Sequence, residues 1–404
     1  MLGKRVFAAL AIGTASLASI GLARPAYAAA GGLDPTFGNG GKVLTPVGGI
    51  VDNALLQSNG DIVAGGTFGI LRYLPNGSLD NGFGRHGLAA DPNGAAGLAM
   101  EPNGEFLAVG ETPNPDREFA VARFTASGVL DPAFGHGGVV TTPFPNAPDG
   151  AGADAVLVEP NGDILVGGLA MIPGTTRNQP IVTLGALARY TPNGTLDTSF
   201  GNGGLVQSTA AVGDIANLGI DATGDIFVLP AHAEFSPAGQ LDSGVTAATI
   251  TVSSTGGPDA FLSSGQSLIA SSVGVGRAMT DVKVQRFNAD GTVDPAFNNP
   301  QFTYTGAQFA GHQSTAAITV QPDGKVVVVG ASFFGTSVFG AARLNSTGSL
   351  DSGFGNAGVL TTSFQGDDIA RAVLVQPNGD IVAIGFSEDN SAGAVSIALA
   401  RYLG

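Results

Sequence analysis

A nine-residue phrase, Leu-Asp-x-x-Phe-Gly-x-Gly-Gly, recurs along this chain and limits its fold more than any other feature. It starts at Leu33 and returns at Leu79, Leu130, Leu196, Leu241, Val293 and Leu350. Two copies depart from it: the phrase at Leu241 lacks Phe-Gly, and the one at Val293 ends in Asn-Asn-Pro. Regular recurrence over some fifty residues is typical of architectures in which each unit packs on its neighbours.

Two further phrases keep step with the first. One is an apolar run, a tight turn and a second apolar run, as around Asn378-Gly379 and Asp323-Gly324. The other is Ala-x-Arg followed by an aromatic residue or Leu and then a turn, as at Arg189. Asn-Gly and Asp-Gly favour two-residue turns between antiparallel strands. Each unit is therefore expected to hold three strands plus a fourth after the Leu-Asp phrase.

Composition agrees with an all-β chain. The 404 residues include 63 Gly and 23 Pro, only 12% are charged, and no stretch has sustained helical spacing of apolar residues. A single repeat would form one twisted sheet with no partner for its apolar faces, whereas neighbouring sheets stacked face to face bury each other's faces. We therefore expect a seven-bladed β-propeller of four-stranded antiparallel blades. An open β-solenoid is the alternative.

The two ends of the chain fit a closed ring. The repeat region starts with the Leu33 phrase, which belongs to a fourth strand, and stops at Arg401-Tyr402, which belongs to a third strand. Pairing of the N- and C-terminal strands would complete one blade and remove the exposed sheet edges.

The three phrases together resemble those of the bacterial delta-60 repeat family. The resemblance rests on Gln-Pro-Asn-Gly-Asp-Ile at Gln376, Ala-x-Arg-Tyr at Arg189 and the Leu-Asp-x-x-Phe-Gly copies, and it covers about residues 31–404. It implies a β-propeller repeat domain of unassigned function. It implies no reaction, cofactor or catalytic residue.

The first 28 residues have the pattern of an export signal. Lys4 and Arg5 precede an apolar run, and Ala26-Tyr27-Ala28 matches the small-residue pattern before a cleavage site. We expect a signal peptide at 1–28 and a single propeller at 29–404. The protein would then be secreted, periplasmic or on the cell surface, with no membrane span after signal removal.

Charge and cysteine content exclude several classes. The formal net charge of −15 argues against nucleic-acid binding, which needs a basic surface to neutralise phosphates. The chain has no Cys, so it has neither disulfides nor thiolate metal sites.

A recurring Arg precedes the Leu-Asp phrase by a fixed interval. In most units the Asp follows the Arg by eight residues, a spacing that brings the two side chains together across a short hairpin. We interpret these as structural ion pairs rather than as a ring of anion-binding sites. They are Arg72–Asp80, Arg123–Asp131, Arg189–Asp197, Arg286–Asp294, Arg343–Asp351 and, across the closure, Arg401–Asp34. Glu234 takes the Arg position beside Asp242.

Variable connections on one face of the ring are where a ligand site is expected, because loops on a rigid scaffold usually carry binding. Several carboxylates precede the innermost strands and could form an acidic collar at the channel mouth. The candidate ligand-binding residues are Asp52, Asp154, Asp214, Asp368 and Arg371.

Two functions remain open. The first is a monomeric, non-enzymatic binding scaffold that contacts a protein, a glycan or an envelope component. The second is a hydrolase or lyase that uses carboxylates at the mouth, which clustered carboxylates with shifted pKa values would favour. No catalytic residue and no cofactor is predicted; if a cation binds the collar, oxygen donors suit calcium or magnesium better than zinc.

Overall fold

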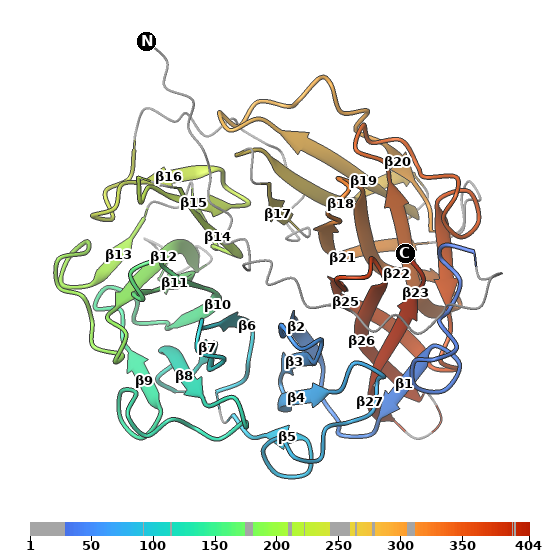
Figure 1. Cartoon of the computed structure of the whole chain (residues 1–404). Helices are drawn as coiled ribbons and strands as arrows, with labels where there is room; N and C mark the ends of the chain where they lie inside the picture. Colours follow the sequence, from blue (N-terminus) through green and yellow to red (C-terminus); the bar gives the residue numbers. More distant parts are fainter. Residues whose placement is uncertain are drawn as a thin grey trace.

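Seven antiparallel sheets arranged in a ring make up the protein (Figure 1). The computed structural model describes residues 29–404, apart from 92, 114, 174–180, 209–211, 222, 243–258, 263–264, 277–278, 305–311, 390 and 392. Within these limits no residue lies in a helix, so none has the length and hydropathy to cross a membrane as a helix. The expected seven-bladed β-propeller is confirmed.

Each blade runs from an innermost strand at the channel to an outer strand at the rim (Figure 1). Blades one to three contain β2 (Val51–Leu56), β3 (Ile62–Gly66), β4 (Gly69–Tyr73) and β5 (Leu88–Ala89); β6 (Gly97–Met100), β7 (Phe106–Glu111), β8 (Phe119–Phe124) and β9 (Val139–Thr142); and β10 (Ala151–Val158), β11 (Ile164–Ile172), β12 (Val182–Tyr190) and β13 (Leu205–Gln207).

Blades four to seven follow in the same order. They contain β14 (Asn217–Ile220), β15 (Ile226–Leu229) and β16 (Ala233–Phe235); β17 (Asp259–Phe261), β18 (Ser267–Gly276), β19 (Met279–Phe287) and β20 (Gln301–Phe302); β21 (His312–Val320), β22 (Val326–Phe334), β23 (Thr336–Leu344) and β24 (Val359–Thr362); and β25 (Asp367–Val375), β26 (Ile381–Asp389), β27 (Ala394–Tyr402) and β1 (Lys42–Thr45). For blade four, the expected fourth strand would fall in 243–258, outside the described residues.

The ring closes through blade seven, as the two chain ends indicated. Strand β1 pairs antiparallel with β27, with Lys42 opposite Ala400 and Thr45 opposite Ile397. A further bridge joins Leu33 to Tyr402. The outer strand of the last blade is therefore supplied by the start of the repeat region.

The hydrophobic core is divided among the joints between blades. Each of six clusters combines buried side chains of two neighbouring blades. Between blades three and four, for example, Leu187 and Phe200 pack with Ile226 and Phe235. Adjacent blades thus bury each other's apolar faces, which a single sheet could not do.

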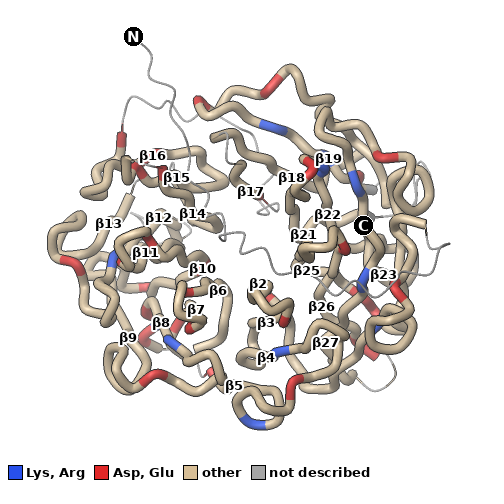
Figure 2. The backbone as a smooth tube through the Cα atoms, viewed as in Figure 1, with Lys and Arg blue, Asp and Glu red and all other residues tan. Residues whose placement is uncertain are grey.

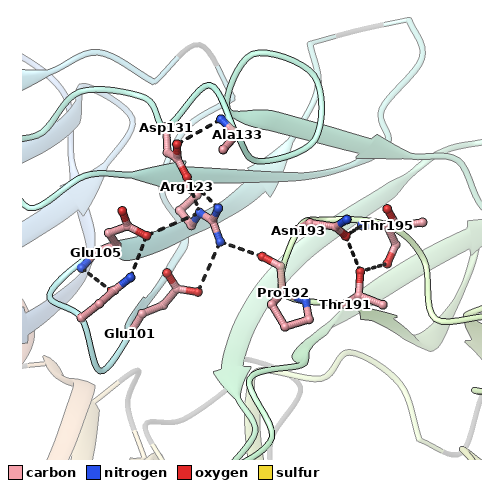
Figure 3. A network of polar contacts seen from close by, with 10 residues as sticks. Glu101, Glu105, Arg123, Asp131, Ala133, Thr191, Pro192, Asn193 and Thr195 are labelled. Atoms are coloured by element: carbon pink, nitrogen blue, oxygen red, sulfur yellow. Dashed lines mark hydrogen bonds and ion pairs between the residues drawn. The ribbon is translucent and has the colours of Figure 1, made fainter.

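The recurring Arg adds a polar contact to the joints. Arg123 binds Asp131 of its own hairpin, with Nη2 2.6 Å from Oδ2, and its Nη1 donates to the Pro192 carbonyl of the next blade at 2.6 Å (Figure 3). Its guanidinium also lies 4.8 Å from the Phe134 ring centroid, a favourable cation–π arrangement. We call an Arg with these contacts a joint arginine.

The same contacts recur around the ring. The Arg–Asp pairs join Arg72 to Asp80, Arg189 to Asp197, Arg286 to Asp294, Arg343 to Asp351 and Arg401 to Asp34. The carbonyls reached in the next blade are those of Ala126, Pro237, Ser346 and, from Arg401, Pro75. In Asp197 the hydrogen bond from Ser199 and that from Arg189 outweigh burial, so its pKa is lowered. The motif Asp therefore accepts from its own turn and from the joint arginine.

Candidate functional site

A β-bulge recurs in the innermost strand of several blades, and it fixes which side chain lies at the channel mouth. The register shifts by one residue between Val51 and Asn53 in β2, and likewise in β10, β21 and β25. The extra residues are Asp52, Asp154, Ala316 and Arg371. A bulge redirects the extra side chain, so two acids and one base share one structural position.

Glycine on the second strand permits this bulge. A Cβ on Gly66 would lie 1.9 Å from the Ile50 carbonyl oxygen, and a Cβ on Gly168 would lie 2.1 Å from that of Gly152. The bulged strand therefore approaches so closely that only glycine fits opposite it.

Asp154 is the centre of a group of carboxylates. Burial, the charge and hydrogen bond of Asp214, and the charges of Glu111 and Asp52 together raise its pKa to about 8, with burial the largest cause. Oδ2 of Asp154 is buried with no hydrogen-bond partner among the described residues. Asp214 as a whole residue is solvent-exposed, yet the protein around its carboxyl group excludes enough water to raise its pKa as well. Asp154 and Asp214 thus form a carboxyl pair that does not fully ionise at neutral pH.

The group extends to both sides of the pair. Asp52 is exposed at its bulge, where partial burial raises its pKa and the charge of Arg371 lowers it. On the other side, burial raises the pKa of Asp259 to about 7; Nδ2 of Asn217 is 3.3 Å from its Oδ1, and the charge of Asp214 acts on it. Residues from six blades therefore influence one another's charge at the mouth, while other acids lie on outer loops (Figure 2).

Asp368 has a different place from the other candidates. It is fully buried in β25, where its Oδ2 accepts from the Phe364 backbone N–H at 2.6 Å. Burial raises the pKa of Asp368, although hydrogen bonds from Ser387 and from the turn before β25 lower it. These contacts brace the connection from β24 into β25. The side chain of blade seven that acts on the carboxylate group is Arg371, whose charge lowers the pKa of Asp52 and whose guanidinium lies 5.9 Å from the Phe386 ring centroid.

Glu111 was not among the sequence candidates. It ends β7, and its Oε2 would lie 3.0 Å from a Cβ placed on Gly152 of β10, so it reaches across to blade three. Arg117 pairs with it through Nη2. Its position directly after Gly110, which has the same place in its strand as Gly66 and Gly168, was the available signal.

The mouth offers oxygen donors but no preformed metal site. Within the described residues, no group of three or more His, Cys, Asp or Glu side chains has the arrangement to hold a metal ion.

Five segments of the chain match the family model described as "Domain of unknown function (DUF5122) beta-propeller": residues 57–83, 101–134, 159–200, 273–297 and 321–354. These matches support a β-propeller repeat family of unknown function. Among curated proteins, none matches this sequence.

Solved structures of similar fold are distant in sequence. A protein of unknown function from Dyadobacter fermentans is 13% identical over 90% of this chain and 97% of its own, with a TM-score of 0.40. The calcium-binding protein regucalcin from Agrobacterium tumefaciens is 9% identical over 89% and 96%, with a TM-score of 0.37. A gluconolactonase from Xanthomonas campestris is 11% identical over 88% of each chain, with a TM-score of 0.37. Likeness at this level says nothing of ligand or reaction.

Proposed function

We propose that this chain is an exported binding protein that holds a positively charged ligand at the channel mouth. Export is supported by the N-terminal pattern of residues 1–28, and the repeats by their delta-60-like phrases. The binding role is supported above all by the Asp154–Asp214 pair. Carboxyls held this close repel one another when ionised, and a bound cation relieves that repulsion.

The neighbourhood of the pair favours a cation over an anion. Asp52, Glu111 and Asp259 add further negative charge around Asp154 and Asp214. Arg371 is the basic side chain that acts on Asp52, and it would orient a ligand by repelling its positive group toward blades three and four.

Calorimetric titration tests the proposal with two probes, calcium and spermidine. We expect heat with at least one probe, and tighter binding at pH 8.5 than at pH 6 because the carboxyls must ionise to bind a cation. An Asp52→Asn/Asp154→Asn double variant should lose most of this affinity. Asp163→Asn, which removes one carboxylate from the turn after β10 at the opposite end of the strand, should not. Absence of heat with both probes, or equal heats in the double variant, would contradict the proposal.

Acid–base catalysis is the second candidate function, and the same pair favours it. A carboxyl with a pKa of about 8 beside a more readily ionised one can act as acid and base together. In that case a panel of chromogenic glycosides and lactones should include a substrate whose hydrolysis Asp154→Asn abolishes. Cation binding with no turnover across the panel favours the binding protein.

A further inference from the structure

A cavity of about 390 Å³ lies between blades five and six, at the end of the ring opposite the mouth. Its walls are mainly apolar and include Leu262, Leu268, Val320 and Val326. Among the described residues that line it, Arg286 is the charged one. Pockets that bind small molecules have this size and this combination of apolar walls with few polar groups.

Arg286 makes fewer contacts than the joint arginines of blades one to three. In Arg72, Arg123 and Arg189, Nε and Nη2 both contact the motif Asp.

In Arg286, only Nε binds Asp294, at 2.8 Å, and Nη1 donates to the Ser346 carbonyl at 3.0 Å. Gln266 donates to the same Asp294 oxygen at 2.8 Å. Across the described part of the chain, no hydrogen bond uses Nη2 of Arg286.

Blades two and three show what is missing beside Arg286. At the first residue of the turn after the innermost strand they carry Glu101 and Glu159. The carboxylates of these residues lie 3.8 Å and 4.0 Å from Nη1 of Arg123 and Arg189. Blade five has Leu262 at this position. With Leu262 in place of a Glu, Arg286 lacks this counter-charge and the cavity has an apolar wall.

We infer that this cavity is a second binding site, for a small monocarboxylate with a short apolar tail. The ligand carboxylate lies in the region that the Glu side chain holds in blades two and three and forms an ion pair with Arg286, whose planar guanidinium suits carboxylates. The tail packs against Leu262, Leu268 and Val320. This site is independent of the mouth and has the opposite charge preference.

A matched pair of probes tests the inference on the unmodified protein. Hexanoate and hexanamide have similar size and tail but differ in charge, and saturation-transfer NMR compares them at equal millimolar concentration. We expect a signal from hexanoate that salt weakens, and at least ~tenfold weaker binding of hexanamide, the effect of losing about 1.4 kcal/mol of charge interaction. No hexanoate signal, or equal binding of both probes, would overturn the inference.

Variants at Leu262 locate the site. Leu262→Glu installs the side chain that blades two and three carry, so it should fill the cavity, pair with Arg286 and abolish hexanoate binding. Leu262→Met keeps the wall apolar and should retain it. If Leu262→Glu folds and binds hexanoate as before, the site is not here and the inference fails. The probe pair decides the question if that variant does not fold.

Discussion

The joint between blades three and four differs from the joint between blades four and five, although both connect consecutive repeats. The first contains a cluster of buried apolar residues and the joint arginine Arg189, which binds Asp197 and the Pro237 carbonyl. At the second joint, the residues that the structure describes make less extensive contacts. Nδ2 of Asn217 lies 3.3 Å from Asp259, and the ring centroids of His232 and Phe287 are 4.9 Å apart.

The difference follows from two changes in one repeat. Glu234 stands where the other blades have the joint arginine, and the phrase at Leu241 lacks Phe-Gly. A carboxylate has no N–H to donate to a carbonyl of the next blade. The comparison shows that the Arg and the Phe-Gly phrase together join a blade to its successor. They do more than brace their own hairpin.

Deleting Leu33–Thr45 should have the largest effect, because it turns the closed joint of blade seven into an open edge. The deletion removes β1, the Asp34 partner of Arg401 and the Phe37 ring beneath its guanidinium. We expect a loss of roughly 5 kcal/mol or more, which approaches the whole stability of many proteins. Urea unfolding measures it. A melting temperature equal to that of the intact protein would disprove closure.

Arg189→Ala should make the joint between blades three and four resemble its weaker neighbour. Removing a mostly buried guanidinium leaves the Pro237 carbonyl without its donor and Asp197 without its counter-charge. We expect a loss of about 2 kcal/mol in unfolding free energy, with ligand binding at the mouth unchanged. Arg85→Ala removes the same charge from an exposed turn and serves as the control. If both variants lose equally little, the joint arginine has no structural role.

The carboxyl pair at the inner edge of the same joint should give a smaller, pH-dependent effect. The pKa of Asp154 is raised in the folded protein, so the folded state binds more protons than the unfolded state between pH 4 and pH 8. Stability should therefore fall as pH rises through that range. Asp154→Asn should flatten this dependence and melt slightly higher than the parent at pH 8. A parent whose melting temperature does not change over that range would contradict the assigned pair.

Much of the fold could be predicted from the sequence because it is repeated. Each turn phrase predicts that the two strands beside it pair. Because the phrases recur in seven units, the repeat is recognisable even though single copies, such as that at Leu241, differ. The closure followed from the strand types at Leu33 and Tyr402. The fourth strand of blade four could be expected only by analogy, since its phrase has changed.

The site was harder to predict because it is not repeated. Asp52, Asp154 and Arg371 each stand seven residues before the Asn of the next turn, which is the bulge position, whereas Asp368 stands ten before it. That offset could have separated Asp368 from the others. Contacts between blades, such as those of Glu111 and Asp214 with Asp154, depend on how neighbouring sheets pack. No local pattern encodes that packing.

Hydrogen exchange across the whole ring tests the central claim most directly, namely that joint arginines and the apolar clusters beside them hold the blades together. Backbone amides exchange fastest where local opening of the structure breaks only a few contacts. The account predicts that β14, β15 and β16 exchange faster than the corresponding strands of blades three and seven, and that Arg189→Ala speeds exchange in β11 and β12. Protection of blade four equal to that of its neighbours, with no change in the variant, would contradict it.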